Sequence, residues 1–533
     1  MRILFDLIYP GYLRYYDAPI KQLAARGHEV EVWFVNDRKV PEGLRALDNE
    51  SRVHVGGRRP RAEPELATVP AIRATGDYLR YLDPAFAEAG YLRRRVALKI
   101  PVGLRWLARL DTLPGPVARR LVAASLRLDE AAPVSHALAQ FLQHRSPDVV
   151  VAGPAVYAGG AQADLLDAAR AARIPTVAAP ASWDNLTTKG LLRGRPDRVL
   201  VWNKALADEA IQLHQVPPER VHVTGAPPFD KWFGREPTTT AEEFAERVGL
   251  PPDKPYVLFV GSTARILAPR AEMEFVRSWI TAMRASDDPL LRDLGVIVRP
   301  HPYSRLGWAE RDLSDLPAAT IWPRGAANPV DEGDRSEYFD SIHHSVAVVG
   351  INTSAMIEAA IIGRPVFTVT PPEFAGTQTG TLHFQHLLPE HGGFVRQATS
   401  IPEHLAQLQA GLRDPDAARE ELHAFVSRFI RPLGLDKPAT DAFVAQIEAA
   451  GASPPLPVPQ RHPFGRLAWM LLEPIGRLDR RFGSDYISTR LTRRAHRHRE
   501  EGKPGAWSLE QTARLLAAVS RELPVEDARE LDV

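Results

Sequence analysis

The sequence predicts an α/β protein with two domains, each built around a mainly parallel β-sheet. Its 533 residues exceed what one ordinary hydrophobic core holds, and this length suggests two to four domains. Short apolar runs alternate with helical stretches over most of residues 1–450, which is the pattern of strand–helix–strand units. A polar connection with Pro228, Pro237, Pro251 and Pro252 separates two such series. The composition, 44% hydrophobic and 25% charged, is that of a soluble globular protein.

The first domain is expected to span residues 1–234. A strand, a tight turn and a helix open it, and Gly27 stands where a helix C-cap glycine belongs. Residues 56–75 are rich in Arg, Pro and Gly and are predicted to form a loop, and residues 78–145 are predicted to form a helical insertion. The expected strands are 3–7, 30–34, 148–152, 176–179, 198–202 and 220–224. The expected helices outside the insertion are 17–25, 160–172 and 204–213.

The second domain is expected to span residues 235–450 with the same alternation of strands and helices. Its expected strands are 256–260, 296–299, 319–322, 345–349 and 366–369. Its expected helices are 272–285, 335–341, 354–362, 403–412, 416–429 and 439–449. A stiff proline-rich linker, residues 451–460, and a basic helical extension, residues 461–533, are predicted to follow.

Two strand ends in the second domain carry polar residues that suit a nucleotide diphosphate. The first strand ends in R-P-H-P at residues 299–302, and the second ends in G-I-N-T-S at residues 350–354, where a helix begins. Open α/β sheets bind ligands at such strand ends, and a helix N-terminus attracts phosphate. Glu358 lies one helical turn further on, where a carboxylate can accept two ribose hydroxyls. The small residues after strand 256–260 allow close approach of a phosphate, and Arg265 can neutralise its charge.

These segments together predict a donor site. Each residue can also be explained by a purely structural role. Taken singly, a His-Pro pair is a common corner, Asn-Thr-Ser is an ordinary helix cap, and Glu358 can be a solvated helix residue. The candidate donor-binding residues are Ser262, Thr263, Arg265, Arg299, His301, Asn352, Thr353, Ser354 and Glu358.

The residues R-P-H-P followed by G-I-N-T-S-A-M-I-E-A-A-I-I-G-R-P-V resemble the C-terminal domain of GT-B glycosyltransferases. The nearest group is that of bacterial surface-polysaccharide transferases, with the CDP-glycerol glycerophosphotransferases and capsule transferases. The resemblance implies two Rossmann-like domains that face each other across a cleft. It also implies that His301, Thr353 and Ser354 contact the donor phosphates, that His301 and Arg299 act on the leaving phosphate, and that the helix with Glu358 contacts the ribose.

A polar loop at residues 182–190 follows strand 176–179 and is the candidate acceptor side. Asp184 can deprotonate an acceptor hydroxyl, or Asp184 and Asn185 can simply cap a turn. Related enzymes often place a His or Asp base after the first strand, but this chain has no His there. The base is therefore open between Asp17, Asp6 and Asp184, although Asp6 is better explained as a buried strand residue. The candidate acceptor-binding residues are Tyr12, Arg14, Asp17, Trp183, Asn185 and Lys189.

Neither a metal nor a cofactor is expected. The chain has no cysteine, which excludes disulfides and cysteine zinc sites, and no Asp-x-Asp motif ends a strand. Retaining GT-B enzymes commonly carry two glutamates eight positions apart, whereas Gly350 stands eight residues before Glu358. The resemblance therefore favours an inverting reaction.

Two basic stretches predict contact with an anionic membrane surface. Residues 93–127 carry nine Lys or Arg against Asp111 alone, and residues 461–499 carry ten Arg around a Trp/Leu cluster. Packed helices with a solvated basic face are the alternative. A net charge of +1 argues against nucleic-acid binding. The start MRILFDLIYPGY predicts a buried strand and not a signal peptide, so the expected location is cytoplasmic. The two basic stretches favour peripheral contact with the inner membrane.

The function expected from the sequence is a glycosyltransferase or glycerophosphotransferase. It would move a group from a nucleotide-activated sugar or polyol donor to a surface-glycan or lipid-linked acceptor. Two alternatives remain open at this point, a UDP-sugar 2-epimerase of the same fold and a non-catalytic scaffold that binds nucleotide sugars. Release of nucleotide with and without an acceptor separates the three.

Overall fold

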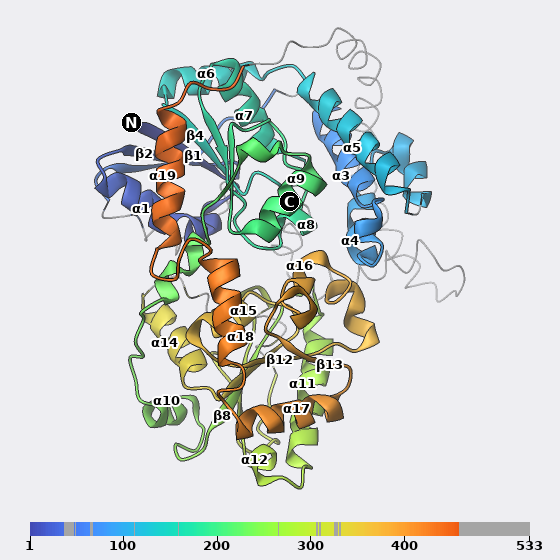
Figure 1. The fold of residues 1–533 in the computed structure, drawn as a ribbon, viewed down its shortest axis with the longest axis vertical. Coiled ribbons are helices and arrows are strands. Elements are labelled where there is room, and N and C mark those ends of the chain that lie inside the picture. The colour runs from blue at the N-terminus through green and yellow to red at the C-terminus, as the bar shows by residue number, and fades with distance from the viewer. Residues whose placement is uncertain are drawn as a thin grey trace, which may run out of the picture. The chain divides into compact units, whose positions relative to one another are not determined.

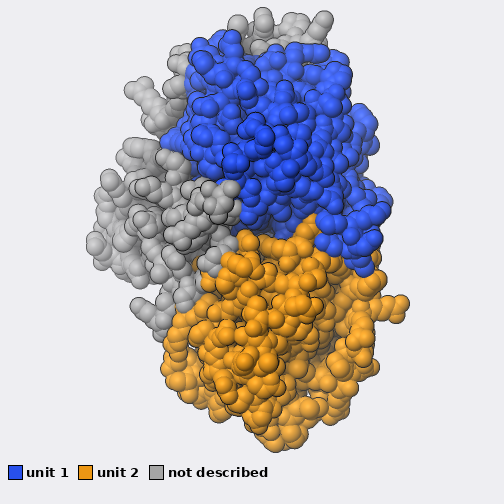
Figure 2. Space-filling model, turned by 90° about the vertical axis from the view of Figure 1, so that its left-hand side faces the viewer, with its two compact units in different colours: residues 1–228, 429–517, 533 blue, residues 229–428, 518–532 orange. Residues whose placement is uncertain are grey.

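The computed structural model describes residues 1–36, 47, 50–63, 68–110, 112–157, 159–264, 266–304, 308, 311–324, 329 and 332–457. Two compact units make up this part of the chain, and Figure 2 colours them separately. The first unit contains residues 1–228 and the described residues from 429 onward, and the second contains residues 229–428. The predicted basic extension, residues 461–533, lies outside the described residues.

A seven-stranded parallel sheet forms the core of the first unit, in the order β3-β2-β1-β4-β5-β6-β7. Its strands are β1 (Arg2–Leu7), β2 (Glu29–Phe34), β3 (Val53–Arg58), β4 (Val149–Gly153), β5 (Thr176–Ala178), β6 (Arg198–Val201) and β7 (Val221–Val223). The central strands β1 and β4 are almost entirely buried, because helices cover both faces of a parallel sheet. This burial explains why these strands read as continuous apolar runs.

A six-stranded parallel sheet forms the core of the second unit, in the order β10-β9-β8-β11-β12-β13. Its strands are β8 (Tyr256–Val260), β9 (Gly295–Arg299), β10 (Ala319–Ile321), β11 (Ala347–Gly350), β12 (Val366–Val369) and β13 (Arg396–Ala398). The α/β class with two parallel sheets, predicted from the sequence, is thereby confirmed. A cleft between the two domains stays a prediction.

Helices pack on both sheets (Figure 1). Those of the first unit are α1 (Asp17–Ala25), α3 (Thr68–Arg80), α4 (Gly90–Ala97), α5 (Gly115–Glu130), α6 (His136–Arg145), α7 (Ala161–Ala171), α8 (Asn185–Thr188), α9 (Lys204–His214) and α19 (Ala439–Gly451). Those of the second unit are α10 (Ala241–Val248), α11 (Pro269–Arg284), α12 (Pro289–Arg292), α14 (Glu332–His343), α15 (Ala355–Ile362), α16 (Leu382–Gln385), α17 (Ile401–Arg413) and α18 (Arg419–Phe425). A short π-helical turn, Val426–Ile430, follows α18 where one helix over 416–429 was predicted.

The last described helix, α19, packs on the first sheet and lies beside α1 (Figure 1). Glu448 of α19 forms ion pairs with Arg26 at 2.9 Å and with His28 at 3.0 Å. Its apolar face joins the core of the first unit through Phe443 and Ile447. The compact units therefore change at Pro228 and again after Arg428, where the sequence suggested boundaries at 234 and 450.

The predicted loop over residues 56–75 is wrong at both of its ends. Strand β3 occupies Val53–Arg58, and α3 begins at Thr68. Gly56, one of the glycines that suggested a loop, is a packing feature, because a Cβ atom on it would lie 2.3 Å from the Trp33 ring of the neighbouring strand. Gly57 instead has a left-handed backbone, with φ of +81°. The polar Arg59 is buried, and its Nε donates a 2.6 Å hydrogen bond to Asp6.

Buried charges attach the helical insertion to the first sheet. Arg73 of α3 pairs with Asp129 of α5 at 2.7 Å and with Asp164 of α7 at 2.8 Å. Arg193 pairs with Asp77 of α3 at 2.8 Å and reaches Asp129 at 3.5 Å. These residues form a buried ionic network that joins α3, α5 and α7.

The basic stretch 93–127 is only partly exposed. Arg95 of α4 turns inward and donates a hydrogen bond to the carbonyl of Thr188. On the outside stand Leu98, Trp106, Val117 and Leu121, four of the seven exposed large apolar side chains among the described residues. The packed-helix interpretation therefore describes part of this stretch, and contact with a membrane stays a prediction.

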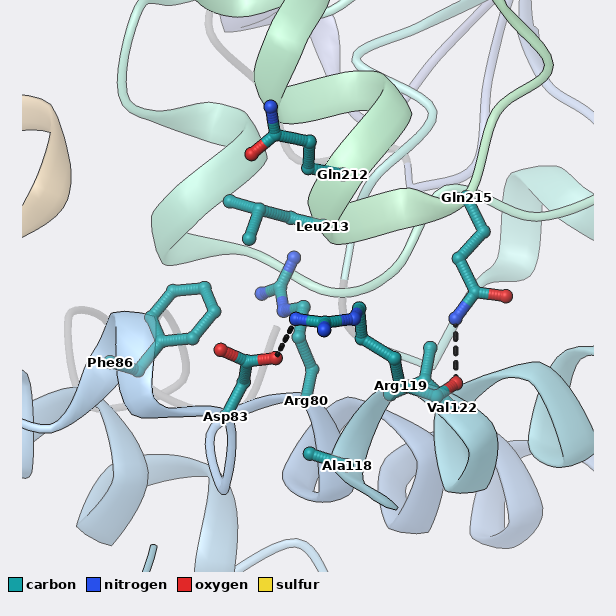
Figure 3. A pocket seen from close by; sticks show the side chains of 9 residues that line it. All are labelled: Arg80, Asp83, Phe86, Ala118, Arg119, Val122, Gln212, Leu213 and Gln215. Atoms are coloured by element: carbon teal, nitrogen blue, oxygen red, sulfur yellow. Dashed lines mark hydrogen bonds and ion pairs between the residues drawn. The ribbon is translucent and has the colours of Figure 1, made fainter. Parts of the chain in front are cut away.

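A small recess lies between α3, α5 and α9 (Figure 3). Its polar groups bind to one another. Arg119 pairs with Asp83 at 3.4 Å, and Gln215 donates to the carbonyl of Arg119 at 2.8 Å. These contacts make the recess part of the packing between the insertion and α9.

The core of the second unit contains His404 of α17, which has no exposed surface. Neither ring nitrogen has a hydrogen-bond partner among the described residues, and the ring packs against Trp279 and Phe367. Burial lowers the pKa of His404 from its ordinary 6.5 to about 4, because a protonated ring would be an unpaired buried charge.

We expect the His404→Leu variant to lose a pH dependence that the wild type has. The unfolded imidazole binds a proton below pH 6.5 and the folded one only below about 4, so wild-type stability falls as the pH drops through this window. The difference in unfolding free energy between wild type and variant should change by about 3 kcal/mol between pH 6.5 and 4. Urea unfolding over pH 4–7.5 measures it, with His423→Leu on the exposed side of α18 as control. A constant difference would contradict the assignment.

Candidate functional site

The predicted donor residues gather at the carboxyl edge of the second sheet. Strands β8 and β11 are neighbours, and the chain runs from β8 toward β9 and β10 but from β11 toward β12 and β13. Their ends therefore lie at the point where the strand order reverses, which is where open α/β sheets bind ligands. Residues 261–263 follow β8 and residues 352–354 follow β11, while Arg299 ends the neighbouring strand β9 and residues 300–301 come after it.

A glycine brings the ends of β8 and β9 together. The Gly261 N–H donates to the Arg299 carbonyl at 2.8 Å, and a Cβ atom on Gly261 would lie only 2.9 Å from the His301 nitrogen. Any other residue would push the R-P-H-P corner away from β8. The glycine thus sets the position of Arg299 and His301.

Ser262 joins three of the predicted segments from within. It is fully buried, its hydroxyl accepts the Asn352 N–H at 3.4 Å, and its carbonyl accepts the Ser304 hydroxyl at 3.1 Å. Its own N–H donates to Glu272 of α11 at 2.6 Å, and the Trp308 indole donates to the same carboxyl group at 3.2 Å. Burial raises the pKa of Glu272 to about 8. The geometry makes Ser262 a support for the site.

Asn352 is a second supporting residue. Its side-chain amide donates to the Thr377 carbonyl at 2.8 Å and lies 3.2 Å from the His383 ring. It therefore holds the segment after β12 against the end of β11. Thr353 and Ser354, which are half-buried, follow it at the start of α15, with Ser354 as the N-cap residue.

Arg299 presents a buried cation at the end of β9. The residue is 6% exposed, and its guanidinium lies 4.8 Å from the centre of the Tyr338 ring. An ion pair with Glu337 spans 3.5 Å, and neither Nη1 nor Nη2 makes a hydrogen bond within the described residues. Burial lowers the pKa of Arg299, although Tyr338 and Glu337 oppose this. The arrangement suits an anion that can accept two parallel N–H bonds.

Glu358 is held by the residue that supports Arg299. The Tyr338 hydroxyl donates a hydrogen bond to Glu358 Oε2, so one tyrosine of α14 contacts both predicted donor residues. Burial and the adjacent carboxylate raise the pKa of Tyr338 well above its ordinary value, which keeps the hydroxyl a donor. The half-buried Glu358 carboxylate is thereby fixed in orientation.

The structure thus brings Arg299 and Glu358 together through Tyr338, and ties Ser262 and Asn352 beneath the same edge. His301 and Thr263 stand half-buried on the adjoining turns. Arg265 lies outside the described residues. The sequence did not single out Tyr338, Glu337 or Glu272. The one signal for the first two is their place on a helix that immediately precedes β11.

On the first unit, the loop with Asp184 begins α8. Asp184 Oδ2 accepts the Thr188 hydroxyl at 2.9 Å and Oδ1 accepts the Asn185 amide at 3.1 Å. Asn185 Oδ1 accepts the N–H groups of Ala181 and Ser182, so Asn185 does cap the turn. Asp184 is half-buried and held in a fixed orientation, whereas Trp183 is buried.

Three of the other predicted acceptor residues meet near the end of β1. Tyr12 is 8% exposed, Arg14 contacts Tyr15, and the Lys189 ammonium lies 5.5 Å from the Tyr157 ring centre. Asp17 begins α1 and is half-buried. Asp6 is fully buried in β1 and paired with Arg59 at 2.6 Å, in agreement with its interpretation as a buried strand residue. Burial raises the pKa of Asp6.

Within the described residues no group of three or more His, Cys, Asp or Glu side chains is placed to hold a metal ion. No helix in the same part of the chain has both the length and the apolar character needed to cross a membrane.

No protein-family model and no curated protein sequence matches this chain. Several solved structures are similar to it in fold. They include the UDP-GlcNAc 2-epimerase from Methanocaldococcus jannaschii, with a TM-score of 0.46 and 12% identity over 84% of this chain and 99% of that one. A glycosyltransferase from Rickettsia africae ESF-5 has a TM-score of 0.47 and 11% identity over 84% and 98%. MurG from Acinetobacter baumannii has a TM-score of 0.43 and 14% identity over 84% and 99%. With identities and TM-scores this low, function has to be inferred from this chain's own residues.

Proposed function

We propose that the chain is a glycosyltransferase of the GT-B type that uses a nucleotide-activated sugar. The second unit holds the nucleotide diphosphate of the donor, and the first unit holds the acceptor hydroxyl and its base. A polyol phosphate donor, as in a glycerophosphotransferase, fits the same diphosphate site. A surface glycan or a lipid-linked glycan is the proposed acceptor.

The observation that supports this proposal most is the Arg299 guanidinium. Within the described part of the chain this buried cation has one ion pair, at 3.5 Å, and such burial is costly unless a further anion approaches it. The guanidinium lies at the end of β9, one strand away from the reversal between β8 and β11, and Tyr338 links it to Glu358 in the first turn of α15. The N–H groups and the helix dipole at the start of α15 also favour phosphate. Both features fit a diphosphate at one position.

The position of Glu358 supports the proposal that the donor carries a nucleotide. The Tyr338 hydroxyl fixes its carboxylate, and a fixed carboxylate can accept hydrogen bonds from two ribose hydroxyls. Tyr338 then positions both Arg299, which would bind the phosphate, and Glu358, which would bind the ribose. This pairing distinguishes a nucleotide from inorganic phosphate.

In the proposed reaction, an acceptor hydroxyl oxygen attacks the anomeric carbon of the donor sugar. The new carbon–oxygen bond forms while the bond from that carbon to the donor phosphate oxygen breaks, and its electron pair leaves with the nucleoside diphosphate. The hydroxyl proton passes to the Asp184 carboxylate. Arg299 and His301 stabilise the negative charge on the leaving phosphate, and direct displacement inverts the anomeric configuration.

The test is nucleotide binding by calorimetry with CMP, CDP, UDP and GDP. Loss of a charge-assisted hydrogen bond costs about 1.5–3 kcal/mol, so Arg299→Met, His301→Ala and Glu358→Gln should each weaken binding about ten- to a hundredfold. Arg270→Met is the matched control, because Arg270 is an exposed arginine of the same unit. Equal affinity of the wild type and all three variants would remove this site.

Turnover measurements separate the transferase from its alternatives. A transferase releases nucleotide from a nucleotide sugar only when an acceptor is present. Interconversion of the sugar at C2 without any acceptor would identify an epimerase, and nucleotide-sugar binding without turnover would identify a scaffold.

The proposal includes peripheral contact with an anionic membrane. Trp106 is 58% exposed, and Leu98 and Leu121 are exposed among the arginines of the helical insertion. Apolar insertion and charge attraction act together at such a surface, with about 1 kcal/mol for each Arg or Lys near it.

Vesicle co-sedimentation should therefore detect binding to phosphatidylserine-containing vesicles that falls steeply with salt. Trp106→Ser and a chain ending at Pro459 should each sediment less than the wild type, and Leu290→Ser, which removes an exposed apolar residue of the second unit, should not change sedimentation. No sedimentation by the wild type would mean that the acceptor need not be lipid-linked.

A further inference from the structure

The helix α8, which begins directly after Asp184, is a single turn of four residues. A turn of this length makes too few backbone hydrogen bonds to offset the cost of forming it. The carbonyl groups of residues 186–189 also lack a following turn, because the N–H groups of Gly190 and Leu191 donate to Val156 and Asp77 instead. Side chains from other parts of the first unit must therefore hold this turn in place.

The buried Arg80, at the end of α3, donates to two of these carbonyl groups at once. Its Nη1 donates to the Leu186 carbonyl at 2.9 Å, and its Nη2 donates to the Lys189 carbonyl. The residue is only 2% exposed. Because the planar guanidinium presents its N–H groups in a rigid fork, Arg80 fixes the distance between the two ends of α8.

The remaining carbonyl groups of the turn have donors from the same helical insertion. The Tyr81 hydroxyl donates to the Thr187 carbonyl at 3.0 Å, and Arg95 of α4 donates to the Thr188 carbonyl. Arg80 also donates to the Tyr81 hydroxyl at 3.0 Å, so these two donors are held together. The insertion therefore contacts every carbonyl group from residue 186 to residue 189.

A buried histidine adds a further donor from α9. The Leu192 N–H donates to Nδ1 of His214 at 2.9 Å, so the proton of the neutral ring lies on Nε2, which donates to the Leu186 carbonyl at 2.7 Å. Burial, with the Arg80 cation adding to it, lowers the pKa of His214 well below its ordinary 6.5. The ring therefore stays a neutral donor near neutral pH.

The turn held in this way carries the proposed base. The Asp184 carbonyl accepts the N–H groups of Thr187 at 3.1 Å and of Thr188 at 2.9 Å. Its carboxylate accepts hydrogen bonds from the side chains of Thr188 and Asn185, and both of these residues belong to α8. A displacement of α8 would therefore move the Asp184 carboxylate with it. Catalytic groups need to be held within about 0.5 Å of their working geometry.

We propose that Arg80 is a positioning residue that holds α8 so that the Asp184 carboxylate meets the acceptor hydroxyl. The proposal rests on the transferase function, in which Asp184 is the base. Arg80 acts through the backbone of α8 and not through contact with either substrate. The helical insertion then contributes to the rate of transfer as well as to the packing of the first unit.

Arg80→Met should lower kcat by about ten- to a hundredfold and leave nucleotide affinity unchanged. Methionine fills much of the same space but has no N–H group, and a displacement of about 1 Å near a reacting group has an effect of this size. Nucleotide release at saturating donor and acceptor measures kcat, and calorimetry measures nucleotide affinity. The milder Tyr81→Phe, which keeps the ring and removes one donor, should lower kcat about two- to tenfold and serves if Arg80→Met does not fold.

A double-mutant cycle with Asp184→Asn separates positioning from a general loss of stability. If Arg80 acts through Asp184, adding Arg80→Met or Tyr81→Phe to Asp184→Asn should lower kcat by less than about twofold more. Arg73→Met is the matched control, because Arg73 is a buried arginine of the same helix whose ion pairs are with α5 and α7. It should lose stability and keep its kcat at a temperature at which it is folded. Rate losses that multiply in the double variants, or a wild-type kcat for both Arg80→Met and Tyr81→Phe, would overturn the inference.

Hydrogen exchange keeps this inference separate from the proposed function. The amides of Thr187, Thr188 and Lys189 should exchange faster in Arg80→Met than in the wild type or in Arg73→Met. Wild-type exchange of these amides in Arg80→Met would overturn the inference whatever the activity of the chain. The proposed function would instead be removed by the wild type alone, if it releases no nucleotide in the presence of any acceptor.

Discussion

Asp184→Asn should slow turnover by about 10² to 10⁴ and leave nucleotide affinity unchanged. Asparagine has the shape of aspartate and can keep a hydrogen bond from the Thr188 hydroxyl, but it cannot accept the proton of the attacking hydroxyl. The two side-chain hydrogen bonds on Asp184 hold its carboxylate in one orientation, as a general base requires. Steady-state nucleotide release with a saturating acceptor measures kcat, and calorimetry measures donor affinity.

The same variant separates catalysis from capping. If Asp184 only holds the Asn185 and Thr188 side chains in place, the variant should be less stable and turn over as fast as the wild type. Asp208→Asn is the matched control, because the Asp208 side chain is 44% exposed on α9 and pairs with Lys204 of the same helix. A normal kcat for Asp184→Asn would return the choice of base to Asp17.

Arg73→Met should lower the free energy of unfolding of the first unit by about 3–5 kcal/mol. The substitution removes the cation that the buried Asp129 shares with the partly buried Asp164 and Asp167, and loss of one partner of a buried ion pair carries a cost of this size. Burial already raises the pKa of Asp167 to about 7, with Asp129 adding to the effect. Urea unfolding measures the loss, and hydrogen exchange should show it first in α3 and α5.

Arg195→Met is the matched control for the buried ionic network. Arg195 pairs with Glu130 at 2.7 Å but is 43% exposed, so its loss should cost no more than about 1 kcal/mol. The double variant Arg73→Met/Asp129→Leu should recover part of the stability that Arg73→Met loses, because it removes a buried carboxylate that would keep only the 3.5 Å contact with Arg193. Equal losses for Arg73→Met and Arg195→Met would show that burial adds nothing to this pair.

Much of the fold could be predicted because the parallel strands are buried on both faces. Runs such as those of β4 and β8 must then be apolar along their whole length, and they stand out between polar turns. The missed strand β3 has an exposed edge and two glycines, so it lacks that pattern. Its Gly56 is explained only by Trp33, which lies on another strand.

The candidate site was predictable to the extent that it follows from strand ends. Arg299, Asn352 and Glu358 were identified because the carboxyl ends of adjacent parallel strands meet at one edge, and that edge follows from chain order. The direction in which each side chain points was not predictable. Ser262 was a candidate for donor binding, yet it is fully buried and its N–H donates to Glu272 of α11.

The sequence by itself determined which segments form strands and helices, and which polar residues stand at strand ends, because both depend on neighbours within about one element. Tertiary structure alone decided which of those residues contact the same neighbouring side chain. Tyr338 reaches Arg299 and Glu358, Tyr157 reaches Lys189, and Arg73 reaches Asp129, each across elements that the chain separates. The periods of helices and strands determine the face on which a side chain lies. Its partner on that face depends on how the elements pack against one another, and the packing is determined by burial of the whole core.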